Sequence, residues 1–224
     1  MYTHRDVPPR PLNTDLTAIT ALGLLAERPR HPYEMQRLIR YRDKSYVKGL
    51  PRSLYHAIDR LAAAGLVEAG EPTREGRRPE RTVYSITDAG REELESWLAD
   101  LLATPDANDP SAYWAALSLI PYLTPEQALG ALRARRSVLE LELAGGRARM
   151  EGLRSMLPRL LMLEEEQRLA ALEAEHAFTA GLAGELERGE LTWDVDQLRR
   201  LAESAQDGDL ANVRAALGDA EDSR

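Results

Sequence analysis

Apolar residues recur at three- and four-residue intervals along most of the chain, which predicts a mainly helical protein. In the N-terminal part this spacing predicts helices over residues 15–26, 32–43, 51–64 and 88–103. Gly65 follows the third helix and is expected to end it by adopting the left-handed backbone conformation. The first two helices are joined by a short connection, as two helices that cross steeply require.

The capping residues of these helices can also be predicted from their chemistry. Asn13 or Thr14 is expected to cap the first helix, and Pro32 to open the second. Pro51 suits the first position of the third helix, and Thr87 suits the N-cap of the fourth.

Between the third and fourth helices, the pattern changes to two short extended segments, LVEA and TVYSI. The residues that separate them, EPTREGRRPER, combine turn-forming proline and glycine with four arginines. A helix followed by a basic hairpin predicts a winged helix-turn-helix, which places one helix in a DNA groove and a cationic finger beside it.

The C-terminal half is predicted to be helical throughout. A short helix ends at Pro121, and a long one begins at Pro125. Ten positions from Leu129 to Leu160 alternate four and three residues apart, and eight of them are apolar, interrupted by Arg136 and Gly146. This pattern is typical of a helix that packs along another helix, either from the same chain or from a second copy. Further helices are expected over about 158–189 and 194–206.

Charge is distributed unevenly between the two halves. The chain of 224 residues has a net charge of -8. Residues 1–91 hold 16 Lys and Arg against 11 Asp and Glu, a net of +5, and residues 92–224 hold 13 against 26, a net of -13. The excess of basic residues in the predicted winged helix favours a polyanionic partner.

Several functional classes are disfavoured by what the sequence lacks. There is no cysteine, so disulfides and thiolate metal sites are excluded. We find no secretory signal and no apolar run long enough to span a membrane, and we expect a soluble, cytoplasmic, nucleoid-associated protein without membrane contact. The four histidines are scattered and there is no glycine-rich phosphate loop, so we expect no enzyme, no metal and no cofactor.

The residues expected to contact DNA follow from the periodicity of the third helix. With Leu54, Ile58 and Leu61 as its buried stripe, Arg52 and His56 point away from the core. The candidate DNA-binding residues on this helix and in the hairpin are Arg52, Ser53, Tyr55, His56, Arg60, Arg74, Arg77, Arg78 and Arg81. The arginines of the hairpin are suited to phosphate oxygens, and the first turns of the helix can reach base edges.

Four segments together resemble the PadR family of bacterial transcriptional regulators. AITALGLLAERPRHPYEMQRLI is similar to the opening helices of that family, and GLPRSLYHAIDRLAAAGLVEA to its recognition helix. EGRRPERTVYSITDAGREEL is similar to its wing and the helix that follows. Pro32 departs from the family, in which many members have glycine after the histidine, but it is compatible with a helix start.

The resemblance implies a homodimer that represses transcription at an inverted-repeat DNA operator and is released by an effector. It places Ser53 and Tyr55 at DNA-contacting positions, and it implies a small aromatic effector near Trp97, a residue that can equally serve interface packing. Tyr113 and Trp114 are further candidates for effector or interface contacts. The alternative is a winged helix that binds RNA or another protein without reading an operator.

The expected domain organisation has four parts. Residues 1–13 form a flexible arm, and residues 14–103 form the winged helix-turn-helix domain that binds DNA. Residues 112–206 form a helical dimerisation and effector domain, and residues 207–224 form an acidic tail. We expect the dimer contacts to come mainly from the helices after Pro110.

Overall fold

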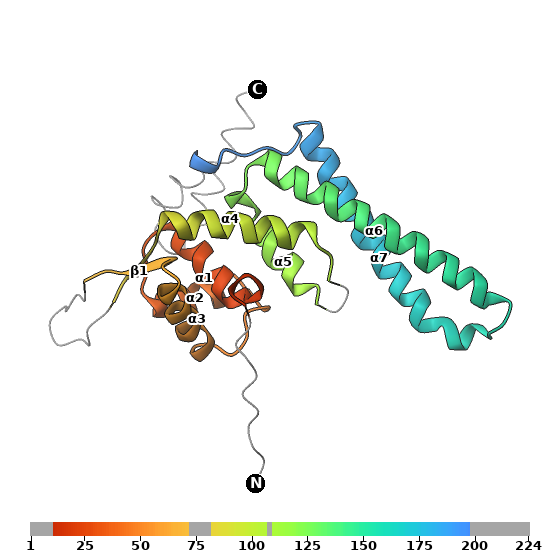
Figure 1. The fold of residues 1–224 in the computed structure, drawn as a ribbon, viewed down its shortest axis with the longest axis horizontal. Coiled ribbons are helices and arrows are strands. Elements are labelled where there is room, and N and C mark those ends of the chain that lie inside the picture. Colours follow the sequence, from red (N-terminus) through yellow and green to blue (C-terminus); the bar gives the residue numbers. More distant parts are fainter. Residues whose placement is uncertain (1–10, 72–81, 107–108, 198–224) are drawn as a thin grey trace, which may run out of the picture. The chain divides into compact units, whose positions relative to one another are not determined.

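The computed structural model describes residues 11–71, 82–106 and 109–197, which fall into two units (Figure 1). The first unit contains the described residues up to Trp97 together with residues 195–197, and the second runs from Leu98 to Asp194. One helix, α4 (Asp88–Ala103), contributes residues to both units.

The first unit is built from helices and one small sheet. Its elements in chain order are a 3-10 turn (Leu12–Thr14), α1 (Leu16–Glu27), α2 (Pro32–Tyr41), α3 (Arg52–Ala63), β1 (Val67–Ala69), β2 (Tyr84–Ile86) and the start of α4. α1 is the centre of this unit, because eleven of its twelve residues are buried.

The N-cap of α1 is Asp15 and not Asn13 or Thr14, so this part of the sequence prediction is wrong. The Asp15 carboxylate accepts hydrogen bonds from the backbone N–H groups of Thr17 at 3.0 Å and Ala18 at 3.3 Å. The residues before Asp15 form their own 3-10 turn, which leaves the carboxylate at the point where the free N–H groups of α1 begin.

The sheet of the first unit is an antiparallel hairpin in which Val67 pairs with Ile86 and Ala69 with Tyr84. An isolated bridge between Arg30 and Tyr84 adds a third extended segment, with N–H···O distances of 3.0 and 2.9 Å. Gly70 N donates to Val83 O at 2.8 Å, so the two strands stay paired up to the edge of the described residues.

The end of α3 and the start of α4 are joined by a compact turn. Gly65 has φ +72°, as its position after α3 predicts. The Thr87 hydroxyl donates to Gly65 O at 2.9 Å and accepts from Gly90 N at 3.1 Å, so Thr87 is the predicted cap. A Cβ on Gly90 would lie 2.1 Å from Leu66 O, so the close approach of α4 to this turn requires glycine.

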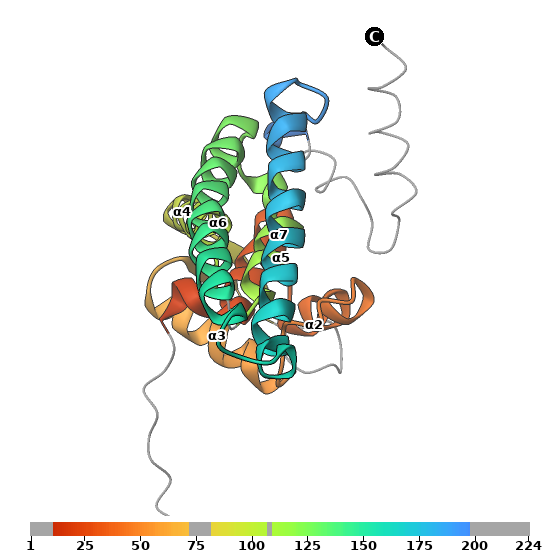
Figure 2. The same ribbon diagram turned by 90° about the vertical axis from the view of Figure 1, so that its right-hand side faces the viewer.

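In its described residues the second unit contains helices and no strand. After the end of α4 it contains α5 (Ser111–Ser118), a 3-10 turn (Ile120–Tyr122), α6 (Pro125–Arg154), a second 3-10 turn (Arg159–Met162) and α7 (Leu163–Glu187). The long helices α6 and α7 lie side by side as a hairpin in both views (Figures 1 and 2). A capping box of Thr124 and Gln127 fixes the start of α6, with Pro125 in its first turn.

The heptad pattern predicted between Leu129 and Leu160 faces α7 of the same chain. Leu139, Leu143 and Met150 pack in one cluster with Met162, Leu169 and Leu172. We call this contact of α6 with α7 the seam. Gly146 belongs in it, because a Cβ there would lie 2.4 Å from Leu169 Cδ2.

The predicted seam deviates from the structure at two places. The buried arginine is Arg135, which is 2% exposed, and not Arg136. Leu160 is 75% exposed, because α6 ends at Arg154 and the helical spacing does not continue through Pro158.

The prediction of a mainly helical fold with a small hairpin is confirmed. Within the described ranges, no helix is long and apolar enough to cross a membrane.

Candidate nucleic-acid interface

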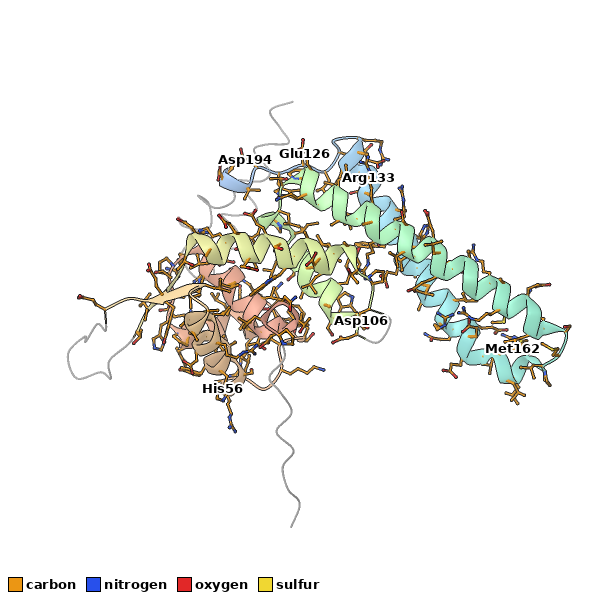
Figure 3. All side chains as sticks on the ribbon, in the orientation of Figure 1. His56, Asp106, Glu126, Arg133, Met162 and Asp194 are labelled. Carbon is orange, nitrogen blue, oxygen red and sulfur yellow. The ribbon has the colours of Figure 1, made fainter. Side chains whose placement is uncertain are left out.

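The helix α3 has one buried and one exposed face. Leu54, Ile58 and Leu61 are at most 1% exposed, which confirms the predicted stripe. Arg52 and His56 are exposed on the other face. Figure 3 shows His56 on α3 in the first unit. The side chains of Arg52, Tyr55 and His56 in the first two turns are therefore exposed to solvent.

Arg52 and His56 contact each other on this exposed face. Arg52 Nε donates to His56 Nε2 at 3.3 Å, one helical turn away. The remaining N–H groups of Arg52 are donors of the kind that phosphate oxygens or guanine accept.

Ser53 and Tyr55 flank this pair in different environments. The Ser53 hydroxyl donates to Lys48 O at 2.7 Å, so its proton holds the loop before α3 and its lone pairs remain as acceptors. Tyr55 is 46% exposed and can donate its phenolic O–H.

Arg60 has a partner within the fold that the sequence did not indicate. Its Nη1 donates to Asp15 Oδ2 at 2.9 Å, and the Arg60 side chain is 31% exposed. Asp15 is also the N-cap of α1, so this ion pair ties α3 to the start of α1. The binding of Arg60 to DNA stays a prediction.

The four arginines predicted for the wing, Arg74, Arg77, Arg78 and Arg81, lie outside the described residues. The structure describes the strands on either side of them, β1 and β2, up to Gly70 and Val83.

The sequence prediction overlooked an ion-pair network at the end of α1. Glu27 accepts from Arg30 Nη2 at 2.6 Å and from Arg42, whose second nitrogen lies 3.0 Å away. Arg30 is 3% exposed, and its Nε donates to Leu24 O at 3.1 Å. Arg42 is thus used partly to fix the end of α2. Burial lowers the pKa of nearby Lys44, and the charge of Arg42 lowers it further.

Two tyrosines on α2 were also overlooked. Tyr33 and Tyr41 are each 60% exposed, and Arg37 and Arg40 between them are exposed as well. The two tyrosines lie on the face of α2 opposite the buried Met35. This helical spacing could have predicted from the sequence that they are exposed.

The candidate effector residues are placed differently from one another. Trp97 is buried at 8% exposure, whereas Trp114 is 55% exposed. Tyr113 is buried, and its hydroxyl lies 3.1 Å from Thr179 Oγ1. Burial raises the pKa of the Tyr113 hydroxyl, and the hydrogen bond with Thr179 lowers it in part. No cluster of three or more His, Cys, Asp or Glu that could hold a metal ion occurs in the described part of the chain.

Comparison with known proteins gives one match to a family of sequences. Residues 21–96 match the profile of the Transcriptional regulator PadR-like family. No curated protein matches the chain.

Solved structures with similar chains include three from this family. The structure of Bacillus subtilis PadR in complex with operator DNA is 16% identical and covers 75% of this chain and 98% of its own, with a TM-score of 0.37. The same protein in complex with p-coumaric acid is 14% identical, covering 77% and 99%, with a TM-score of 0.35. The PadR-like regulator BC1756 from Bacillus cereus is 18% identical, covering 82% and 99%, with a TM-score of 0.34.

Proposed function

We propose that this chain, which belongs through residues 21–96 to the PadR-like family of transcriptional regulators, is a homodimeric repressor of an inverted-repeat operator. It acts on chromosomal DNA in the cytoplasm, enters the major groove with α3, and leaves the operator when an effector binds. The observation that carries this proposal is the exposed pair of Arg52 and His56 on a helix whose opposite face is buried.

The proposed reading of bases rests on where this pair lies. Arg52 is the first residue of α3, and His56 is one turn further on. In helix-turn-helix proteins the N-terminal residues of the second helix reach the base edges. Arg52 is suited to guanine, whose O6 and N7 accept two hydrogen bonds side by side. Ser53 and Tyr55, on the flanks, are assigned to the DNA backbone or to neighbouring bases.

The contacts with the DNA backbone are assigned to the arginine-rich segment between β1 and β2. Arg74, Arg77, Arg78 and Arg81 supply planar donors for phosphate oxygens, which carry no sequence information. Contacts with the DNA backbone are also assigned to the exposed Tyr33, Arg37 and Arg40 on α2. The first helix of a helix-turn-helix crosses the DNA backbone, which supports this assignment.

An effector completes the proposed cycle. We assign it to a flat aromatic compound that contacts Trp97, Tyr113 or Trp114. Trp114 is the most exposed of the three, so it can stack on a ligand without prior rearrangement of its surroundings.

The proposal is tested by titrating the protein with a fluorescent duplex that has been selected from random sequences. We expect two half-sites in the selected duplex, and affinity that falls steeply between low and high salt as counterions are released. Binding that prefers single-stranded RNA, or an absence of salt dependence, would favour the alternative of an RNA-binding or protein-binding winged helix.

A further inference from the structure

Asp59 is an acidic residue on the face of α3 that carries Arg52 and His56. It follows Arg52 by seven residues and His56 by three, and all three side chains are exposed. At 3.6 residues per turn, this spacing keeps them within about 60° of one another on the helix surface. A carboxylate on a face assigned to DNA needs a reason of its own, because the phosphates of the duplex repel it.

The carboxylate of Asp59 has no partner among the described residues. No hydrogen bond or ion pair joins its side chain to any part of the chain that the structure describes. The adjacent Arg60 donates to Asp15 Oδ2 at 2.9 Å instead. The residues one turn before and after Asp59 on α3 include no lysine or arginine: they are Tyr55, His56, Ala62 and Ala63. An ion pair within α3 therefore does not explain this acid.

The end of α3 leaves the Asp59 carboxylate open to a large partner. Ala62, Ala63 and Ala64 follow it, and all three are exposed. Their methyl groups are too short to hold a duplex away from the carboxylate. The exposed surface at this end of α3 thus combines one acceptor with small apolar groups.

The chemistry of the bases decides which partner suits such an acceptor. Only two bases present a donor in the major groove, cytosine through its N4 amino group and adenine through its N6 amino group. Adenine also has the N7 acceptor beside its amino group, and this acceptor repels a carboxylate. Guanine and thymine present acceptors at their edges, and phosphates have no donor. The carboxylate of Asp59 is therefore matched to cytosine.

The spacing along α3 suits two separate base contacts. Helices that read the major groove use side chains three and four residues apart over about two turns, and Arg52, His56 and Asp59 have this spacing. Seven residues at 1.5 Å each separate Arg52 from Asp59 by about 10 Å along the helix axis. Bases of one strand are about 3.4 Å apart. The two contacts are therefore expected about three base pairs apart.

We propose that Asp59 is a specificity-determining residue that accepts a hydrogen bond from the N4 amino group of a cytosine in each half-site. This cytosine lies about three base pairs from the guanine assigned to Arg52. The inference rests on the proposed function, and it adds a base that the operator has to contain. At any other sequence the carboxylate faces acceptors or phosphates without a donor, which weakens binding to the wrong duplex.

The test is the selection of duplexes from a random pool by the full chain and by two variants of Asp59. The wild type should prefer cytosine at one position of each half-site by at least about fivefold over the other bases. Asp59→Ala should lose this preference and keep the guanine. Asp59→Asn should favour adenine at the same position, because a carboxamide pairs with both N6 and N7 of adenine.

Two further variants serve as controls for charge and for position. Glu92→Ala removes an exposed carboxylate from α4 in the same unit, and it should leave every base preference as in the wild type. Arg52→Ala should lose the guanine and keep the cytosine. Thermal unfolding followed by circular dichroism checks that each variant keeps its fold. Titration with the selected duplex, and with one in which the C·G pair is replaced by T·A, measures the preference directly.

The outcomes separate this inference from the proposed function. A wild-type chain that selects no sequence would refute the proposed function and this inference with it. If the wild type selects an operator and Asp59→Ala has the same base preferences, the function stands and the role of Asp59 is overturned. An equal gain in affinity of Asp59→Ala for all duplexes would also overturn it, since Asp59 would then only repel phosphates.

Discussion

The guanidinium carbon of Arg135 lies 3.7 Å from the centroid of the Tyr113 ring, and both side chains are buried. Arg135 also donates to Glu175 Oε1 at 2.6 and 2.8 Å. Its third nitrogen donates to the carbonyls of Leu101, Leu102 and Thr104 at 3.1 to 3.2 Å. One buried charge thus satisfies the free carbonyls at the end of α4 and binds them to α5, α6 and α7.

Replacing this arginine should destabilise the second unit strongly. In Arg135→Met, the α4 carbonyls and the Glu175 carboxylate no longer have their donor, and the free energy of unfolding should fall by about 3 kcal/mol. Arg133→Met is the control, because its ion pair with Glu187 is exposed and such pairs contribute less than about 1 kcal/mol. Thermal unfolding followed by circular dichroism measures both. Equal melting temperatures for the two variants would contradict the proposed role of Arg135.

Gly90→Ala should destabilise the junction of the hairpin with α4. The added Cβ would meet Leu66 O at 2.1 Å, a backbone atom that cannot move without disturbing the turn after α3. Gly130→Ala is the control, since nothing lies within 4 Å of its added Cβ and alanine favours a helix by up to about 1 kcal/mol. The melting temperature is expected to fall for the first variant and to stay or rise for the second.

Arg52→Ala/His56→Ala should reduce specific DNA binding while leaving the fold intact. Both side chains are exposed, so the melting temperature should change little. The binding free energy for the operator is expected to weaken by roughly 1–3 kcal/mol for each base that the variant no longer recognises, and that for a scrambled duplex by less. We expect Arg52 to contribute more than His56. Unchanged specificity with a lower melting temperature would mean that the pair supports the fold instead.

Arg77→Ala/Arg78→Ala should weaken binding to all duplexes by similar factors. These arginines are assigned to phosphates, so their removal should also flatten the dependence of affinity on salt. Titrations with operator and scrambled duplexes at several salt concentrations measure this. A reduction confined to the operator would show that the wing reads bases.

The carboxyl of Glu165 should titrate at unusually low pH. The hydrogen bonds from Arg168 lower its pKa from 4.5 to about 2, and the charges of Arg168 and Arg149 contribute. Because the pKa is lower in the folded protein, the stabilisation from this carboxylate is complete above pH 4.5 and disappears as the pH falls towards about 2.

Carbon-13 NMR of the Glu165 carboxyl measures this pKa directly. Arg168→Gln should move the midpoint upward towards 4.5, because it removes the largest cause of the shift. Arg147→Gln, which affects a separate ion pair with Glu173, should leave the midpoint in place. A midpoint near 4.5 in the unmodified protein would refute the assignment.

The sequence by itself determined the helices, the hairpin and the exposed face of α3. The local spacing of Leu54, Ile58 and Leu61 defines the buried face of α3 and so leaves the opposite face exposed. The turn at Gly65 depends on the φ that glycine allows. These properties are set by residues close together in the chain, so periodicity and residue chemistry were sufficient.

The tertiary structure decided which polar groups meet across the fold. Arg60 binds Asp15, which is 45 residues away in the sequence, and Arg135 binds Glu175, which is 40 residues away. No local sequence pattern predicts either ion pair. The heptad pattern showed that α6 packs on a helix, but apolar spacing is the same for a helix of the same chain and for one of a second copy. Only the position of α7 in space assigns the seam to the chain itself and leaves Leu141 and Leu160 uncovered.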